Sequence, residues 1–343
     1  MNYYKILKIY RHIESPRIKL LGILALHLSG RRYINVFLDP VLACNLRCQM
    51  CYFSDAEARK NLHGQFSLDD LKALSHSLFR YALKVQIGCG AEPTVSKYLP
   101  NIIRLAKAEH VPYISITTNG NLLTEEKLRE LADAGLSEIT ISAHGFTKET
   151  YERIMQGAHF DLFLQLIDNL EAVRKEHPDF NIRLNYTVNE DNVEELILFS
   201  KIFKNVLPNE LQIRPIQKIG NSSYKNFHLD KIRQGYQQWI QPVVDFCNAN
   251  HITCLYPTLE NLSELEMEGQ KQEPQNNPAD ELPYFHISPY EGWMEKINPY
   301  HESFKDYCQR THRVQFILRS LIGIKKKKAE NLDFTKNLNY NVK

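Results

Sequence analysis

The chain of 343 residues is long enough for one large α/β domain, or for a domain of about 200–250 residues with flanking elements. Its composition, 43% hydrophobic and 24% charged, is that of a soluble globular protein. The formal net charge of +2 gives no global electrostatic argument for a nucleic-acid partner. Seven cysteines, an odd number and unevenly spaced, argue against a disulfide framework and favour a reducing, cytoplasmic location.

Residues 1–31 are expected to form an N-terminal helical segment outside the main domain. The first 17 residues mix charges with apolar side chains and lack the apolar stretch of a secretory signal peptide. The most apolar run, residues 18–28, is too short to cross a bilayer and contains Lys19 and His27. We therefore expect neither a signal peptide nor a membrane span here.

Between residues 32 and 220, short β-rich runs alternate with amphipathic helical runs. The expected strands cover residues 32–39, 83–88, 113–119, 138–143, 182–188 and 211–216, and the expected helices cover residues 67–79, 98–110, 124–135, 160–177 and 193–206. Ser67 with Asp70, and Asn192 with Glu195, have the pattern of helix N-caps with an acid in the first turn. Strands joined by helical crossovers pair in parallel, but periodicity leaves open whether the sheet is open or curled into a barrel.

Residues 221–343 are expected to form a mostly helical C-terminal extension. A long helix is predicted at 228–249, and the polar residues 266–283 are predicted to form a linker. Residues 307–329 contain seven Lys or Arg and no acid, with apolar residues between them. Three interpretations of the basic tail at 310–328 stay open: weak contact with an anionic membrane surface, a nucleic-acid patch, and a helix that packs on the domain with its lysines in water.

Three of the seven cysteines, Cys44, Cys48 and Cys51, fall within eight positions directly after the first expected strand. Thiolates bind soft metals, and three of them on one short loop can converge on one centre. The C-x3-C-x2-C spacing differs from the paired signature of zinc sites, and three ligands leave a fourth position open for catalysis. We therefore predict that these cysteines ligate an iron–sulfur cluster. Three buried cysteines that bind no metal are the alternative.

The motif CNLRCQMCYF (44–53) resembles the cluster-binding signature of radical S-adenosylmethionine (radical SAM) enzymes, in particular the branch with molybdenum-cofactor-biosynthesis and peptide-maturation (SPASM-type) enzymes. Other segments of the same family resemble GCGAEPT (88–94), ITTNGNLL (116–123) and ITISAHGFTKETYERIMQGAHF (139–160). The resemblance covers residues 33–216. It implies an α/β fold with a partial (β/α)6 TIM-like barrel of parallel strands, a [4Fe–4S] cluster on the three cysteines, and S-adenosylmethionine chelating the open iron.

The same resemblance implies which residues contact S-adenosylmethionine. Small residues let the backbone approach a ligand, and an acid suits the ammonium group of the methionine part. The implied cofactor-binding residues are Met50, Gly90, Ala91, Glu92, Pro93, Thr118, Asn119, Ser142 and His144. Ala91 stands where the family usually has a second glycine, His144 where it usually has Asp, and Met155 where an Arg is frequent.

The resemblance also implies a mechanism. An external one-electron donor, flavodoxin- or ferredoxin-like, reduces the cluster, and S-adenosylmethionine is cleaved to methionine and a 5′-deoxyadenosyl radical that abstracts hydrogen from a substrate. A peptide or protein is the first substrate hypothesis, and a lipid-linked or sugar intermediate is the second. The competing hypothesis is a non-enzymatic zinc- or cluster-binding structural module, which would bind no S-adenosylmethionine.

Four cysteines remain outside the motif: Cys89, Cys247, Cys254 and Cys308. Some relatives in this family carry extra clusters in a cysteine-rich C-terminal (SPASM) extension, but the spacing here does not match that pattern. We predict that the three C-terminal cysteines are buried or incidental thiols. Cys89, inside the glycine-rich segment, either faces the active site or fills a tight turn.

Overall fold

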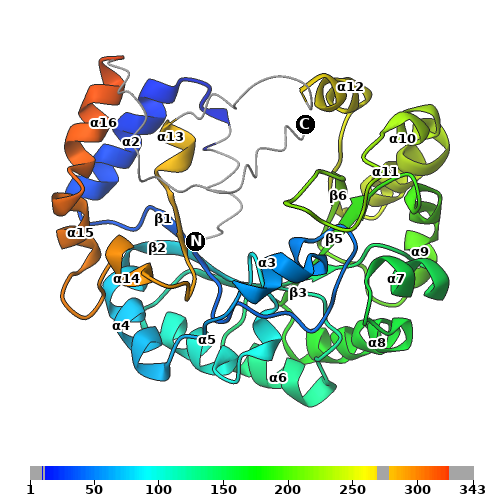
Figure 1. Ribbon diagram of the computed structural model, residues 1–343, viewed down its shortest axis with the longest axis horizontal. Coiled ribbons are helices and arrows are strands. Elements are labelled where there is room, and N and C mark those ends of the chain that lie inside the picture. Colours follow the sequence, from blue (N-terminus) through cyan, green and yellow to red (C-terminus); the bar gives the residue numbers. More distant parts are fainter. Residues whose placement is uncertain (1–9, 11, 269–277, 324–343) are drawn as a thin grey trace.

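The computed structural model describes residues 10, 12–268 and 278–323, which form a parallel β-sheet flanked by helices (Figure 1). The sheet has eight strands in the order β7-β6-β5-β4-β3-β2-β1-β8, and every neighbouring pair is parallel. The strands are β1 (Ile34–Leu38), β2 (Ala82–Ile87), β3 (Tyr113–Thr118), β4 (Glu138–Ser142), β5 (Asn181–Val188), β6 (Glu210–Pro215), β7 (Thr253–Leu255) and β8 (Tyr284–Ile287). The predicted α/β fold with a partial barrel of six strands is confirmed, and one further strand lies at each edge.

Helices connect the successive strands and follow an arc along one side of the sheet in Figure 1. The α-helices are α2 (Pro16–Leu28), α3 (Ala56–Lys60), α4 (Leu68–Leu78), α5 (Leu99–Ala108), α6 (Glu125–Asp133), α7 (Lys148–Ile154), α8 (Phe160–Glu176), α9 (Phe199–Ile202), α10 (Asp230–Gln234), α11 (Gln241–Ala249), α12 (Leu259–Glu268), α13 (Pro278–Glu281), α14 (Trp293–Lys296), α15 (Phe304–Arg310) and α16 (Arg313–Leu321). Shorter 3-10 turns are η1 (Tyr52–Ser54), η2 (Phe79–Tyr81), η3 (Pro93–Val95) and η4 (Val193–Leu198), and η5 (Tyr236–Ile240) is a π-helix. In the part of the chain that the structure describes, no helix has both the length and the apolarity to cross a bilayer.

The two faces of the sheet differ in chemistry because side chains alternate along each strand. Fully buried aliphatic side chains such as Val36, Ile116 and Ile139 belong to the hydrophobic core that the strands share with the helices. Burial of each such side chain contributes roughly 1.5–3 kcal/mol. The opposite face is polar, and there the ammonium group of Lys84 in β2 lies 3.8 Å from the carboxylate of Glu138 in β4. The sheet therefore keeps one face free of the apolar core.

One predicted N-cap is confirmed and one is wrong. Ser67 and Asp70 form a capping box at the start of α4. Asn192 does not cap the following helix, because its side-chain oxygen accepts the backbone N–H of Asn189 at 2.8 Å. Its NH2 group donates to the carbonyls of His144 in the loop after β4 and Thr187 in β5, at 3.1 and 2.9 Å. The segment begins as the 3-10 turn η4 instead of the α-helix expected from residue 193.

The long helix predicted at 228–249 consists of α10, η5 and α11 in succession. Pro242 lies at the start of α11, directly after the π-helical turn. Proline has no backbone N–H to donate to the preceding turn, so the regular hydrogen-bond ladder cannot continue through it. The prediction of helix for this region is thus correct, and Pro242 explains why the α-helix is interrupted.

The expectation of a mostly helical extension missed two strands. β7 and β8 have three and four residues, too few for a periodic pattern, and β8 pairs with β1 across a long separation in sequence. Half of the predicted linker at 266–283, residues 269–277, lies outside the described residues, as does the basic tail from residue 324 onward. The other half is mostly helical, because it holds the end of α12 and all of α13. The domain boundaries expected at residues 31/32 and 220/221 stay predictions.

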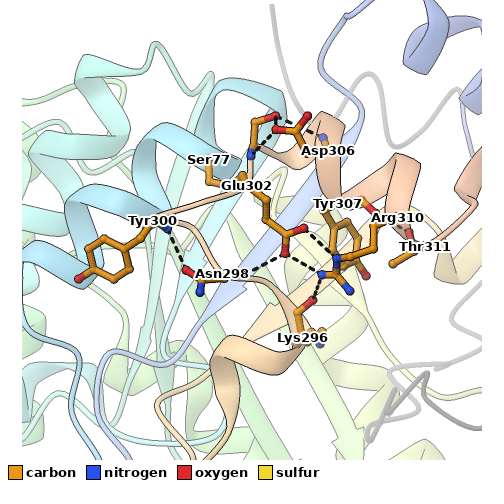
Figure 2. A network of polar contacts seen from close by, with 10 residues as sticks. Ser77, Lys296, Asn298, Tyr300, Glu302, Asp306, Tyr307, Arg310 and Thr311 are labelled. Carbon is orange, nitrogen blue, oxygen red and sulfur yellow. Dashed lines mark hydrogen bonds and ion pairs between the residues drawn. The ribbon is translucent and has the colours of Figure 1, made fainter.

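A polar network joins the C-terminal segment to α4 (Figure 2). The guanidinium group of Arg310 donates to both carboxylate oxygens of Glu302, at 2.6 and 2.9 Å, and the backbone N–H of Asn298 donates to the same carboxylate at 2.9 Å. Ser77 of α4 donates its hydroxyl to the carbonyl of Glu302 at 3.0 Å. The segment between α14 and α15 is therefore fastened beside the first strand–helix unit, where it supports β8 at the sheet edge.

Candidate active site

The loops that follow the strands meet at the carboxyl edge of the sheet, and Asp39 joins two of them. Its Oδ1 accepts the backbone N–H groups of Cys89, Gly90 and Ala91 at 2.7, 2.9 and 3.3 Å, and its Oδ2 lies 3.0 Å from Nε2 of His286. Burial opposes ionisation of Asp39, but the hydrogen bonds from His286 and the backbone outweigh it and lower the pKa of this carboxyl. Sequence reasoning missed Asp39, although an acid at the end of the first strand was a usable signal.

The cysteine loop is fixed by contacts on two sides. Backbone N–H groups of Arg47 and Gln49 donate to the carbonyls of Gln156 and Ile154 after α7, both at 2.8 Å. The guanidinium group of Arg47 donates to the carbonyls of Cys44 and Leu46 at 2.7 Å. The loop after β6 adds a third contact, because the backbone N–H of Tyr224 donates to the carbonyl of Gln49 at 2.9 Å. The three cysteines are thus presented by a backbone that other loops hold in place.

The three thiols of the cysteine loop are shielded from water and lie close to one another. All three are partly buried and free of disulfide bonds. Burial, followed by the charges of Glu92 and Cys51, raises the pKa of Cys44 to about 12, and burial with the neighbouring thiols also raises the pKa of Cys48. Thiolates here therefore need positive charge nearby, which iron supplies. Among the described residues, no group of three His, Cys, Asp or Glu side chains is already placed to hold a single metal ion.

Glu92 is buried, and its carboxylate is surrounded by donors from the protein itself. Its Oε1 accepts the hydroxyls of Thr94 and Thr118, both at 2.6 Å, and the backbone N–H of Thr94 at 3.1 Å. Its Oε2 accepts the backbone N–H of Asn119 at 2.8 Å. Burial still raises the pKa of Glu92 above its ordinary value. This carboxylate therefore joins the end of β3 to the glycine-rich loop after β2.

Buried amides extend this network toward the cysteine loop. The side-chain amide of Asn119 donates to Asn45 at 2.8 Å, which links the loop after β3 to the loop that holds the cysteines. Asn121 donates to the hydroxyl of Tyr151 at 2.9 Å and accepts the backbone N–H of His159 at 2.7 Å. The sequence motif around residue 119 predicted a ligand contact but gave no sign of these partners, which lie far apart in the chain.

The glycine-rich loop has little free backbone. The N–H groups of Gly90 and Ala91 face Asp39, and the carbonyl of Gly90 accepts the hydroxyl of Tyr52. Ala91 is not among the residues with positive φ, so alanine is accommodated without strain. Pro93 packs on Gly88, where a Cβ atom would come within 2.5 Å of the proline ring.

Met50 and Ser142 complete the set of predicted residues at this edge. Met50 is buried, and Asn189 at the end of β5 donates to its sulfur at 3.0 Å. Ser142 is the last residue of β4 and is partly buried. All twelve predicted site residues therefore lie in or beside the loops after β1 to β4.

His144 takes a structural position in the loop after β4. Its Nδ1 accepts the backbone N–H of Thr187 in β5 at 3.1 Å, so the imidazole continues the contact between the two strands beyond their paired residues. Burial, followed by the positive charge of Arg214, lowers the pKa of His144 to about 4. The ring is therefore neutral at pH 7.

The lowered pKa of His144 predicts a loss of stability in acid. Between pH 6.5 and about 4 the unfolded histidine is protonated and the folded one is not, so the unfolded state binds more protons and stability falls as pH falls. Over this window we expect the cluster-free wild type to lose about 1–3 kcal/mol more than His144→Gln. Urea unfolding of both proteins at several pH values measures the difference. Parallel pH profiles would contradict the assignment.

Charged groups on the polar face of the sheet lie mostly in pairs. Arg183 of β5 contacts Glu210 of β6 at 2.7 Å and donates to Gln212 at 2.5 Å. Burial lowers the pKa of Lys84, while the nearby Glu138 opposes that change. Glu138 and Glu210 are the first residues of β4 and β6, so these charged pairs lie toward the amino ends of the strands, away from the carboxyl edge.

The remaining cysteines lie in different parts of the described structure, and only two of the C-terminal ones are neighbours. Cys247 of α11 and Cys254 of β7 are close enough to interact through their thiols at one edge of the sheet. Cys308 of α15 is buried near Tyr33, beside the opposite edge. Three thiols placed in this way cannot share one centre. The backbone N–H of Cys89 donates to Asp39, and this bond holds Cys89 in the turn after β2.

Comparison with known proteins agrees with this geometry. A family model described as the Radical SAM superfamily matches residues 39–199. The chain is 27% identical over 283 residues to a GTP 3′,8-cyclase of Peptoclostridium acidaminophilum, which covers 82% of this chain and 77% of the relative. The matched segment contains the cysteine loop and the loops after the second, third and fourth strands.

Two solved structures share the fold. Streptococcus suis SuiB bound to S-adenosylmethionine matches with a TM-score of 0.56 at 15% identity, over 77% of this chain and 60% of SuiB. The structure of anSMEcpe with bound AdoMet and the Cp18Cys peptide matches with a TM-score of 0.53 at 17% identity, over 86% of this chain and 84% of that one. The chain thus spans about 60% of the length of SuiB. Through residues 39–199 the chain belongs to the radical SAM superfamily, whose enzymes use a [4Fe–4S] cluster and S-adenosylmethionine.

Proposed function

We propose that Cys44, Cys48 and Cys51 each ligate one iron of the cluster in this radical SAM enzyme. The observation that carries the proposal is the single fixed loop with three partly buried thiols, none of them in a disulfide, at the edge where the strand ends meet. When bound and reduced, the cluster supplies the electron that cleaves S-adenosylmethionine and so starts hydrogen abstraction from a substrate. The protein's task is to hold the thiols, orient S-adenosylmethionine and exclude water.

We assign the binding of S-adenosylmethionine to the loops beside the cysteines. The N–H groups of Gly90 and Ala91 are bound to Asp39, so an ammonium group would bind on the carbonyl side of this turn, where the Gly90 carbonyl accepts the Tyr52 hydroxyl and keeps its second lone pair. Asn119 offers a polar group from the third loop, and Met50 offers an apolar surface beside the last cysteine. The other predicted contacts are assigned to the same ligand: Pro93, Thr118, Ser142 and His144.

Glu92 is assigned a positioning role, because its oxygens already accept four hydrogen bonds from the protein. Glu92→Gln places an amide donor where an acceptor is needed, so we expect a loss of about 2–3 kcal/mol in unfolding free energy. The affinity for S-adenosylmethionine should fall at the same time, because the loops after β2 and β3 are no longer joined. Urea unfolding and equilibrium binding of S-adenosylmethionine measure the two effects.

Glu195→Gln provides a matched control for that variant. Glu195 also accepts backbone and hydroxyl donors, from Phe146 and Thr147 at 2.6–3.0 Å. These donors lie at the end of the loop after β4, directly before α7, and not in the glycine-rich loop. We expect a similar loss of stability with little change in affinity. If Glu92→Gln weakened binding without any loss of stability, Glu92 would contact the ligand directly and the positioning role would be wrong.

For the substrate, we propose a peptide or protein first. Support comes from SuiB, a structure of which is described as bound to precursor peptide SuiA. A lipid-linked or sugar intermediate is the second candidate, favoured by exposed aliphatic side chains on α2 and α16. The relatives named GTP 3′,8-cyclase make GTP the nucleotide to test beside them.

The substrate classes are separated by stimulation of 5′-deoxyadenosine formation. The anaerobically reconstituted enzyme receives S-adenosylmethionine and a one-electron donor, with a flavodoxin or ferredoxin proposed as the natural one. Parallel reactions contain a protein and peptide fraction, a lipid extract, or GTP. We expect the protein and peptide fraction to raise the rate and to acquire a new mass. Stimulation by lipid or by GTP alone would overturn the peptide proposal in favour of that class.

A further inference from the structure

Helix α2 has two apolar faces instead of one. Leu20 and Ile23 are buried in the core. Ile18, Leu21 and Leu28 recur at helical spacing on the other side and are 58%, 53% and 70% exposed. A surface helix normally turns charged or polar side chains to water, so an aliphatic stripe of this kind indicates a binding surface.

Helix α16 packs against α2 and adds to this surface. Figure 1 shows the two helices side by side at one end of the molecule. Leu318 on α16 and Ile322 directly after it are 44% and 73% exposed, while Ile317 is buried between the helix and the core. Among the described residues, five large apolar side chains are more than half exposed, and four of them belong to this helix pair.

The charge on the described helix pair is positive. Residues 12–32 and 307–323 together contain seven Lys or Arg residues and one acid. On the described helices, Arg17 and Arg319 are exposed. Asp280 of the neighbouring α13 is bound to Lys19 of α2 at 2.9 Å and so adds no free negative charge. The described helix pair therefore has an excess of positive charge beside its exposed aliphatic side chains.

We propose that α2 and α16 together bind an anionic lipid surface. Aliphatic side chains flanked by cations, without acids between them, match the requirements of an interfacial helix: apolar area enters the headgroup region and cations meet the lipid charge. A second copy of this chain fits less well, because pairing the two surfaces would bring like charges together. The sequence indicated a weak membrane contact at 310–328 with which the apolar run at 18–28 could cooperate, and the exposed side chains make α2 the larger part of the surface.

Sedimentation with vesicles tests this proposal on the full-length protein with its cluster reconstituted. We expect binding to phosphatidylcholine vesicles that contain phosphatidylglycerol, weaker binding to phosphatidylcholine alone, and release at high salt. The triple variant Ile18→Ser, Leu21→Ser and Leu28→Ser should bind at least about tenfold more weakly, because it removes the exposed aliphatic area. Arg17→Gln with Arg319→Gln should reduce the dependence on phosphatidylglycerol.

Ile197→Ser is the matched control, since Ile197 is an aliphatic side chain of similar exposure, 51%, on η4. It should bind vesicles like the wild type. Circular dichroism and 5′-deoxyadenosine formation verify that each variant is folded. The absence of vesicle binding by the wild type, or equal binding by the triple variant, would overturn the proposal. So would light scattering that shows a wild-type dimer broken by the triple variant, because the surface would then be a contact between copies.

Discussion

Cys48→Ala is expected to remove the cluster and the cleavage of S-adenosylmethionine together. Cys48 is the middle ligand of the three, and its thiol is enclosed by the loop and close to both other cysteines. Mutation of a group that only supports a metal ligand typically lowers metal affinity or activity by about 10–100-fold. Loss of a ligand itself should therefore lower 5′-deoxyadenosine formation by at least about 100-fold. Iron analysis and the visible absorbance of the anaerobically reconstituted protein measure the loss of the cluster.

Cys254→Ala is the control for nonspecific loss of a thiol. Cys254 lies in β7 at the edge of the sheet, beside Cys247 and away from the cysteine loop. This variant should keep its iron and its activity. If Cys48→Ala bound iron normally, or if Cys254→Ala lost it, the assignment of the cluster to residues 44–51 would be wrong.

Asp39→Ala should have the largest effect among residues that touch neither the cluster nor the substrate. It leaves the N–H groups of Cys89, Gly90 and Ala91 without their acceptor and removes the contact with His286. Because these groups are only partly buried, water replaces some of the lost bonds, and we expect a loss of about 2–4 kcal/mol in unfolding free energy. The affinity for S-adenosylmethionine should fall at least about tenfold, since the turn is no longer held.

Asp39→Asn removes the negative charge at this position and keeps a side chain of the same shape. Its side-chain oxygen can still accept the three backbone N–H groups, so the turn should survive and most of the stability should be kept. Chemical denaturation and equilibrium binding compare the two variants with the wild type. If Asp39→Ala were as stable as the wild type and bound S-adenosylmethionine equally well, the turn would not depend on Asp39.

The sequence predicted the elements that repeat and the residues that cluster in the chain. All six strands of the barrel lie within one or two residues of their expected ranges, because each is a β-branched run between amphipathic helices. Cys44, Cys48 and Cys51 stood out because they are neighbours in sequence. The α/β fold and the radical SAM family followed from these two local signals.

What the sequence did not predict depends on contacts between distant residues. The bond between Asp39 and His286 spans 247 positions, and neither residue belongs to a recognisable motif. Asn192 has the local pattern of an N-cap, yet its side-chain oxygen accepts the N–H of Asn189 and its NH2 group donates to the loop after β4 and to β5. The strand β8 is only four residues long and is formed because β1 offers it an edge. Such features follow from tertiary packing and not from local propensity.

Formation of 5′-deoxyadenosine by the reconstituted protein tests the account most directly. The protein is reconstituted with iron and sulfide without oxygen, reduced with dithionite in the presence of S-adenosylmethionine, and analysed by mass spectrometry. Production by the wild type and not by Cys48→Ala is the predicted result. A protein that binds no iron, or one that binds a full cluster and gives no 5′-deoxyadenosine with any of the substrate fractions, would contradict the proposed radical chemistry of this site.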